Sequence, residues 1–238
     1  MRALLPLFSC LFLGIALLFP TCTFPAGNLQ DLGNDRLEKI KLPPSALESD
    51  YSLEKAIFER ISRRSFSERP LALEQVAQLL WAAQGTGVDG VTGASRTAPS
   101  AGATYPIEIY VVAGGVDGLE PGVYRYDYVD HSIVKVTPGD RREKLAAAAL
   151  NQHFVVSAPA SIVLAADYGR TTSRYGERGI RYVHMEVGHI AQNIYLQCGS
   201  LNLGAVAVGA FHDERVKLLL EIEEEPLMII PVGEISSR

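Results

Sequence analysis

Apolar residues along the chain recur at two spacings, and the spacing predicts which segments are helices. Steps of three or four residues, typical of a helix with one buried face, occur in five segments. These are residues 53–63, 73–84, 140–150, 177–201 and 214–221. Ser52 is suited to cap the first helix, and Gly85 ends the second. The longest segment, from Glu177 to Leu201, is predicted to be a buried central helix.

Continuous runs of β-branched and other apolar residues predict the strands. The runs are residues 107–113, 122–127, 132–136, 160–166, 205–211 and 226–233. The second and third flank a polar tip at residues 129–131 and predict a hairpin. Residues 86–104, rich in Gly, Ser, Thr and Ala, are predicted to form a loop. Because helices and strands mix without a strict βαβ rhythm or an internal repeat, residues 50–238 are predicted to form one α+β domain.

The N-terminal stretch differs from this domain in composition. Arg2 is followed by an apolar run from Ala3 to Phe19, which is typical of the hydrophobic region of a signal peptide. The run is shorter than the ~20 residues of a membrane span, and a membrane anchor is the alternative for residues 1–25. We therefore expect an exported protein, periplasmic or membrane-anchored, with a cytoplasmic location as the alternative. Residues 26–49 are predicted to be a leader or linker.

Composition narrows the classes of function. The chain has 238 residues, 47% of them hydrophobic and 21% charged, which excludes a disordered chain and predicts a substantial core. Its formal net charge is -5, whereas nucleic-acid-binding proteins normally carry the opposite sign, so we expect no nucleic-acid partner. If residues 1–25 are removed, Cys198 is the single cysteine and no internal disulfide can form.

Three motif searches give negative results. Residues 85–90 match the Gly-x-Gly-x-x-Gly string of dinucleotide-binding folds, but the strand before it and the helix after it are not predicted. His184 and His189 are five residues apart on different faces of the central helix, so no metal site is expected. Cys198 lies in an apolar helix and is predicted to be an inert core residue.

The strongest candidate for chemistry is Arg63-Arg64-Ser65, at the end of the first predicted helix. Two guanidiniums and a hydroxyl in succession offer a charged clamp for a phosphate. The plainer alternative is an Arg pair that only complements the helix dipole. Residues 96–106 form a predicted loop of small residues, which suits close backbone approach to a flat ligand. Arg238 is a distant second cation for the same anion.

Five ordered motifs together resemble the nitroreductase superfamily, and more narrowly its SagB/ThcOx branch. The motifs are Arg63-Arg64-Ser65, residues 79–85, residues 98–106, Arg181-Tyr182 with residues 186–193, and residues 204–211. The resemblance covers about residues 50–233 and implies a nitroreductase-like α+β fold with a central, mostly antiparallel sheet flanked by helices. It also implies an FMN-dependent oxidoreductase, a flavoprotein that forms a homodimer with two flavin sites at the subunit interface.

The resemblance also assigns roles to individual residues. The resemblance places Arg63, Arg64 and Ser65 on the FMN phosphate and ribityl chain. It implies that the second subunit contributes Pro99, Ser100 and Ala101 to the flavin site. Along the isoalloxazine ring it places Ala207, Val208 and Gly209, with the Gly209 amide near N5, where hydride arrives and leaves. Arg238 is the candidate second cation for the phosphate.

One departure from the branch concerns the catalytic side chain. Members that oxidise azolines to azoles have a Lys-Tyr pair before the central helix, where this chain has Arg174-Tyr175. Arg stays protonated and is a poor general base, which puts azoline oxidation in doubt. Tyr175 is then the candidate catalytic acid or hydrogen-bond donor, and an ordinary surface Arg-Tyr pair is the alternative.

The activity that the resemblance implies is hydride transfer through FMN, to or from a small organic substrate, in two half-reactions. The electron donor is NAD(P)H or an organic molecule, and an exported location favours the organic molecule. The alternative function is a flavin- or small-molecule-binding protein of the same fold without turnover.

Overall fold

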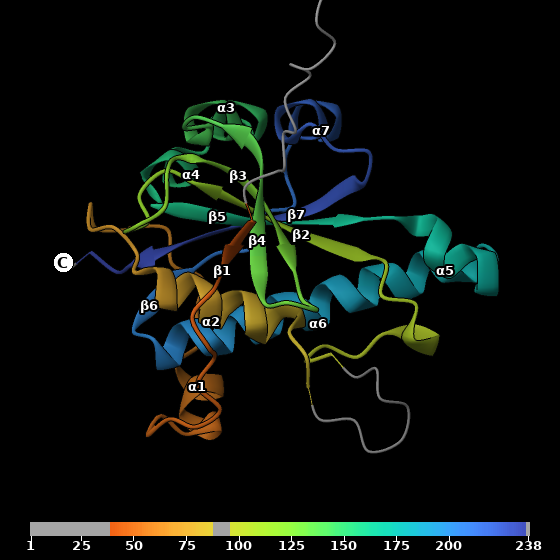
Figure 1. The fold of residues 1–238 in the computed structure, drawn as a ribbon, viewed down its shortest axis with the longest axis horizontal. Coiled ribbons are helices and arrows are strands. Elements are labelled where there is room, and N and C mark those ends of the chain that lie inside the picture. Colours follow the sequence, from red (N-terminus) through yellow and green to blue (C-terminus); the bar gives the residue numbers. More distant parts are fainter. Residues whose placement is uncertain (1–38, 88–95, 237–238) are drawn as a thin grey trace, which may run out of the picture. The chain divides into compact units, whose positions relative to one another are not determined.

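The computed structural model of the protein describes residues 39–87 and 96–236. In this part of the chain seven strands form one sheet in the order β1-β4-β3-β2-β5-β7-β6, and all neighbouring strands run antiparallel (Figure 1). The strands are β1 (Lys39–Lys41), β2 (Ile107–Ala113), β3 (Gly122–Asp127), β4 (Ser132–Pro138), β5 (Ala160–Ala166), β6 (Leu203–Ala205) and β7 (Glu225–Glu234). The helices are α1 (Leu53–Glu59), α2 (Leu73–Gln84), α3 (Arg142–Ala148), α4 (His153–Ser157), α5 (Tyr168–Tyr175), α6 (Arg178–Ser200) and α7 (Asp213–Leu220), with a 3-10 turn, η1 (Ala101–Ala103). The nitroreductase-like α+β fold predicted from the sequence is confirmed.

Helices cover both faces of the sheet, with α2 and α6 on one side and α3, α4 and α7 on the other (Figure 1). β2 and β5 pair along their full lengths at its centre, and alternate side chains of a strand point to opposite faces. Ile109 and Val111 belong to the core that includes α2 and α6, whereas Tyr110 and Val112 belong to the core that includes α3, α4 and α7. Both faces are therefore buried, which explains why the central strands are apolar apart from Glu108 and Ser161.

α6 confirms the predicted long central helix. Its apolar residues form a buried stripe, which consists of Val183, Val187, Ile190, Ala191, Ile194 and Cys198. The opposite face is exposed, and Met185 has 51% of its surface accessible. His184, Gly188, His189 and Gln192 are exposed on α6 as well. In a single chain α6 thus covers the sheet with one face and presents the other to solvent.

The first helix is shorter than predicted. The Ser52 N-cap is confirmed, since its hydroxyl accepts a hydrogen bond from the Lys55 amide at 3.2 Å. However, α1 ends at Glu59 instead of continuing to Arg63. The helix stops because Arg60 already has an extended backbone and residues 63–67 form hydrogen bonds with other segments. The Arg-rich motif therefore lies in an extended segment and not at a helix end.

The strand predicted for residues 205–211 is also shorter than expected. β6 ends at Ala205. Beyond it, the Val206 amide donates to the Pro231 carbonyl at 3.4 Å, and a bridge between Val208 and Ile229 joins the segment to β7. Two hydrogen bonds make this bridge, at 2.8 and 3.0 Å. Gly209 and Ala210 then leave the sheet and are exposed, so their surface is open to a ligand.

Two helices went unrecognised in the sequence because neither shows an apolar period. α4 has five residues, and α5 has eight that are mostly polar. β1 lies inside the stretch predicted as a leader, residues 26–49, and pairs with β4. η1 lies inside the predicted loop. The predicted signal peptide or anchor, residues 1–25, lies outside the described residues, among which no helix is long and apolar enough to cross a membrane.

Candidate functional site

The Arg63-Arg64-Ser65 motif is an extended segment held between β6 and the C-terminal segment. The Arg63 amide donates to the Ala205 carbonyl at 2.8 Å, and the Ser236 amide donates to the Ser65 carbonyl at 3.3 Å. The Ser65 and Ser236 hydroxyl oxygens are 2.5 Å apart. Arg238 lies outside the described residues, but Ser236 shows that the C-terminal segment reaches the predicted phosphate-binding motif.

The two guanidiniums of the motif diverge, because alternate side chains of an extended segment point to opposite sides. Arg63 lines a cavity of about 160 Å³ together with Arg60 and Tyr195. The Arg60 guanidinium carbon is 5.4 Å from the centre of the Tyr195 ring. The Arg64 guanidinium carbon instead lies 5.9 Å from the centre of the Phe154 ring on α4. Arg60, which the sequence analysis missed, therefore shares a cavity with Arg63.

None of these three arginines has an ion pair with another described residue. The ion pairs between described residues involve other side chains. Guanidiniums remain charged at all relevant pH values and bind phosphate through forked hydrogen bonds. Arg60 and Arg63 thus offer a phosphate group two guanidiniums in a cavity that Glu59 also lines, and the Ser65 hydroxyl, which contacts that of Ser236, lies two residues beyond Arg63.

Ala207, Val208 and Gly209 follow β6 and form an open edge beside this donor set. Val208 is buried and fixes the segment through its bridge to Ile229, whereas Gly209 is exposed. A Cβ atom added to Gly209 would meet no other atom within 4 Å. Among the described residues, nothing accepts a hydrogen bond from the Gly209 amide. The segment therefore offers an unhindered amide donor to a flat ligand.

Tyr195 joins the cationic segment to this open segment. Its hydroxyl accepts a hydrogen bond from the Ala207 amide at 2.7 Å. The same hydroxyl is 3.1 Å from the hydroxyl of Ser62, next to Arg63. α6 supports the tyrosine, so the spacing between the two segments is set by a rigid helix. Sequence analysis missed Tyr195, because nothing in the spacing of α6 distinguishes it from other half-buried helical residues.

Replacing Tyr195 by phenylalanine is expected to weaken FMN binding about two- to tenfold, because one net hydrogen bond contributes ~0.5–1.5 kcal/mol. The Ala207 amide loses its acceptor in this variant. Fluorescence titration with FMN measures the change. Tyr168→Phe is the matched control, since the Tyr168 hydroxyl contacts His184 at 3.1 Å and does not contact the two segments. Equal FMN affinity of wild type and Tyr195→Phe would contradict the role of Tyr195.

Gln152 supports the open segment from the opposite side of the sheet. Its side-chain amide lies between α3 and α4 and donates to the Ala149 carbonyl at 2.9 Å and to the Ala210 carbonyl at 3.1 Å. The second bond spans 58 residues of sequence. Gln152 therefore holds the residue after Gly209, and no local pattern in the sequence identifies it.

Pro99, Ser100 and Ala101 lie in a different part of the chain. Asn193 on α6 donates to the Thr97 carbonyl at 3.3 Å and holds the beginning of this loop. No hydrogen bond or ion pair between described residues joins the loop to Arg63-Arg64-Ser65. Within one chain, therefore, the predicted flavin contacts of the Ser100 loop and those of the arginine motif belong to separate parts of the structure.

The loop that carries Ser100 is strained and is held by a buried polar network. Gly102, Ala103 and Tyr105 all have positive φ, an uncommon conformation for residues with side chains. The Ser100 hydroxyl accepts a hydrogen bond from the Tyr105 amide at 2.9 Å and also bonds the Glu186 carboxyl. Such a backbone persists only where surrounding contacts maintain it, and Ser100 provides one contact within the loop and one to α6.

Glu186 is the buried acid of this network, with 2% of its surface accessible. Gln84 donates to its carboxylate at 3.0 Å, and Arg96 in turn donates to the Gln84 oxygen at 2.5 Å. Burial raises the pKa of Glu186 to about 7, although the bonds from Ser100 and Gln84 and the charge of Arg96 favour its ionised form. Sequence analysis assigned no role to Glu186 or Gln84 beyond their place in the family motifs.

Tyr175 and Arg174 end α5 and lie beside the same loop. Arg174 donates to the Gly102 carbonyl at 3.0 Å. The ring of Tyr175 meets that of Tyr182 edge to face, with centroids 5.2 Å apart. The structure therefore places the candidate catalytic Tyr175 next to the Pro99, Ser100 and Ala101 loop and not next to Gly209.

The other residues considered for catalysis or metal binding have surroundings that indicate a structural role. Burial raises the pKa of the Cys198 thiol to about 12, so the thiol is neutral and is not a nucleophile. His184 on α6 contacts the Tyr168 hydroxyl at 3.1 Å. Within residues 39–87 and 96–236, no three His, Cys, Asp or Glu side chains gather as metal ligands.

Comparison with known proteins identifies the family. Residues 57–234 match the Nitroreductase family. A Methanocaldococcus jannaschii protein named as a nitroreductase, MJ1384, is 47% identical over 195 residues, which cover 82% of this chain and 96% of that protein. The trifolitoxin operon protein TfxC of Rhizobium leguminosarum bv. trifolii is 27% identical over 74% of this chain and 54% of that protein. A crystal structure of a nitroreductase from Ralstonia eutropha JMP134 has a TM-score of 0.72 and 30% identity over 87% of this chain and 93% of that one.

These similarities agree with the observed fold. The matched region includes α2, α6, the whole central sheet except β1, and every described residue of the predicted site. Members of the matched family are flavin-dependent oxidoreductases that generally bind FMN. The chain therefore belongs to the nitroreductase family.

Proposed function

We propose that the protein is an FMN-dependent oxidoreductase of the SagB/ThcOx type, which acts on a small organic substrate as a homodimer. The observation that carries the proposal is the Tyr195 hydroxyl, which joins Ser62, next to Arg63, to the open backbone segment at Ala207. The order of the sequence motifs and the similarity to the trifolitoxin operon protein support this branch of the family. FMN supplies, when bound, a two-electron carrier that takes up and releases hydride at N5.

The residues of the chain would divide the tasks of binding. Arg63 and Arg60 would hold the phosphate together with the hydroxyls of Ser65 and Ser236, and Arg64 would contact the ribityl chain. Gly209 would donate its amide to the ring edge near N5, where the missing side chain permits close approach. A backbone donor does not titrate, so this contact would persist across the working pH range.

A second copy of the chain would complete the site. Pro99, Ser100 and Ala101 do not contact the arginine motif in their own chain, and one face of α6 is exposed. Packing two such faces around a two-fold axis would bring the loop of one copy to the arginines of the other. Because Ser100 bonds Glu186 and Tyr105 through its side chain, its backbone would make the contact with the flavin.

Two further parts of the proposal concern location and electron supply. We propose that residues 1–25 direct export, on the basis of their apolar run. Nicotinamide cofactors are cytoplasmic, so an exported enzyme would take hydride from an organic molecule. Cytoplasmic NAD(P)H is the donor if export does not occur.

Absorption spectroscopy of the purified full-length protein tests the proposal. We expect a yellow protein with flavin absorbance, a dimeric mass by light scattering, and loss of colour when a competent donor is added without oxygen. NADH, NADPH and a panel of small heterocycles are the donors to compare. A protein that neither retains nor binds FMN would overturn the cofactor assignment. A yellow protein that no donor reduces would support the alternative, a flavin-binding protein without turnover.

A further inference from the structure

α5 and the first turns of α6 carry arginines and tyrosines that contact one another. The Tyr175 and Tyr182 rings meet edge to face. The Arg174 guanidinium carbon is 5.4 Å from the Tyr175 ring centre, and that of Arg178 is 6.0 Å from the Tyr182 ring centre. Arg181 is exposed one turn after Arg178 on the same helix. These five residues are named the Arg-Tyr patch.

The Arg-Tyr patch is positive although the chain as a whole has a formal net charge of -5. Residues 168–185 contain four arginines but one glutamate. Arg170, the first of the four, pairs with Glu108 at 2.7 Å. Arg178 and Arg181 have no ion pair in the described part of the chain. Two guanidiniums are therefore available to an anionic ligand.

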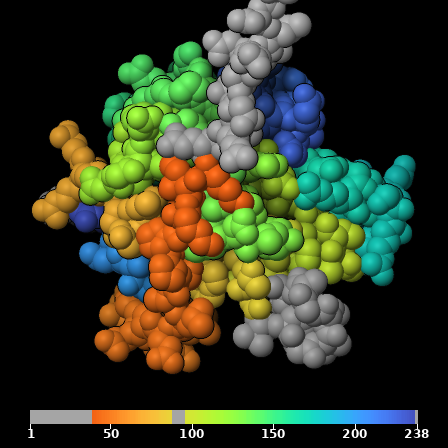
Figure 2. Space-filling model, in the orientation of Figure 1, coloured from red at the N-terminus to blue at the C-terminus, as the bar shows by residue number. Residues whose placement is uncertain are grey.

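The Arg-Tyr patch adjoins the loop that would face the flavin of a second copy. Arg174 donates to the carbonyl of Gly102, directly after Ala101. In the space-filling view the α5 segment (teal) and the loop leading into β2 (yellow-green) lie side by side on the surface (Figure 2). The patch therefore lies directly beside the loop that is proposed to face the flavin of a second copy.

We propose that the Arg-Tyr patch is the substrate subsite of the proposed enzyme, and that it selects planar aromatic substrates with a carboxylate or a similar anionic group. This inference rests on the proposed function. A guanidinium binds a carboxylate through two parallel hydrogen bonds, which an ammonium cannot provide. The two tyrosine rings offer apolar edges and faces against which a planar ring can pack.

The individual residues have different tasks in this subsite. Arg178 and Arg181 bind the anionic group, because both are exposed in the single chain and neither has an ion pair with a described residue. Arg174 is a positioning residue, since it fixes the patch to the loop through the Gly102 carbonyl. The Tyr175 and Tyr182 rings contact the substrate ring. Arg174, which stands in place of the branch's lysine, is thus explained by this positioning contact and not by proton abstraction.

Equilibrium binding to the FMN-loaded, full-length protein tests the subsite without relying on turnover. The probes are 4-nitrobenzoate and 4-nitrobenzamide, which differ chiefly in charge, and isothermal titration calorimetry measures both affinities. We expect the carboxylate to bind more tightly. Arg178→Gln and Arg181→Gln should each weaken carboxylate binding about three- to tenfold and leave amide binding unchanged.

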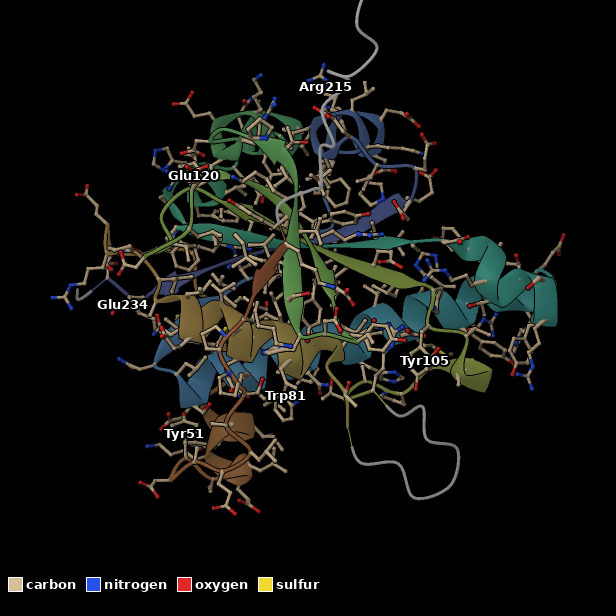
Figure 3. All side chains as sticks on the ribbon, in the orientation of Figure 1. Tyr51, Trp81, Tyr105, Glu120, Arg215 and Glu234 are labelled. Atoms are coloured by element: carbon tan, nitrogen blue, oxygen red, sulfur yellow. The ribbon has the colours of Figure 1, made fainter. Side chains whose placement is uncertain are left out.

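Two control variants sharpen the experiment. Arg178→Lys keeps the positive charge but cannot form two parallel hydrogen bonds with a carboxylate. This variant should therefore retain part of the preference for the carboxylate. Arg215→Gln removes an exposed arginine from α7, on the other face of the sheet, and should change neither affinity (Figure 3). Equal affinities for the two probes in a yellow wild-type protein would overturn the subsite alone. A protein that does not bind FMN would overturn the proposed function, and this inference with it.

Discussion

Replacing Arg63 by alanine is expected to weaken FMN binding about ten- to a hundredfold, because a charge-assisted hydrogen bond contributes ~1.5–3 kcal/mol. Arg63 lines the cavity beside β6 and has no ion pair with a described residue. Its backbone amide keeps its bond to Ala205 in the variant, so the extended segment should retain its position. Fluorescence titration with FMN measures the loss, and circular dichroism shows whether the fold is unchanged.

Arg69→Ala is the matched control for this prediction. Arg69 follows the same segment, but its side chain is 78% exposed and its ion pair is with Glu234 at 3.4 Å. Removing it changes the net charge equally and should leave FMN affinity unchanged. Arg60→Ala tests whether the cavity binds the phosphate: a loss comparable to that of Arg63→Ala is expected. Unchanged flavin content in Arg63→Ala would show that the phosphate is bound elsewhere.

The parts of the fold that the sequence predicts are those in which burial imposes a period. α6 alternates buried and exposed faces over six turns, and β2 and β5 are buried on both faces, so their patterns are long and unambiguous. β1 has three residues and occupies an edge, so its position depends on pairing with β4 and not on its own pattern. α4 has five residues and α5 is mostly polar, so neither has an apolar period that the sequence could show.

Some residues of the candidate site can also be recognised from the sequence, whereas others cannot. Local motifs identify Arg63, Ser65 and Gly209, because a run of donors or a glycine can be recognised in the sequence itself. Tyr195 and Gln152 act on residues 12 and 58 positions away, and the fold alone brings them there. The sequence suggested that two adjacent arginines bind one anion together. In an extended segment, however, neighbouring side chains point to opposite sides, and Arg64 lies beside Phe154.

Replacing Glu186 by glutamine is expected to alter how the free energy of unfolding depends on pH. The pKa of Glu186 is raised from 4.5 to about 7, chiefly by burial. The unfolded chain ionises at its ordinary pKa, so the wild type loses stability as the pH rises from about 4.5 to about 7. The loss attributable to this carboxyl approaches roughly 3 kcal/mol, because one pKa unit corresponds to ~1.4 kcal/mol. Glutamine cannot ionise and should not show this loss.

Urea denaturation at several pH values between about 5 and 8 measures the effect. The stability of Glu186→Gln relative to wild type should rise with pH, since its amide oxygen can still accept from Ser100 while the buried charge is absent. Glu143→Gln, on the exposed surface of α3, is the control and should follow the wild type at every pH. Parallel curves for wild type and Glu186→Gln would show that Glu186 is already ionised throughout this range. FMN affinity measured on the same samples would show whether the charge on Glu186 also affects the Ser100 loop, because that loop is held through this carboxyl.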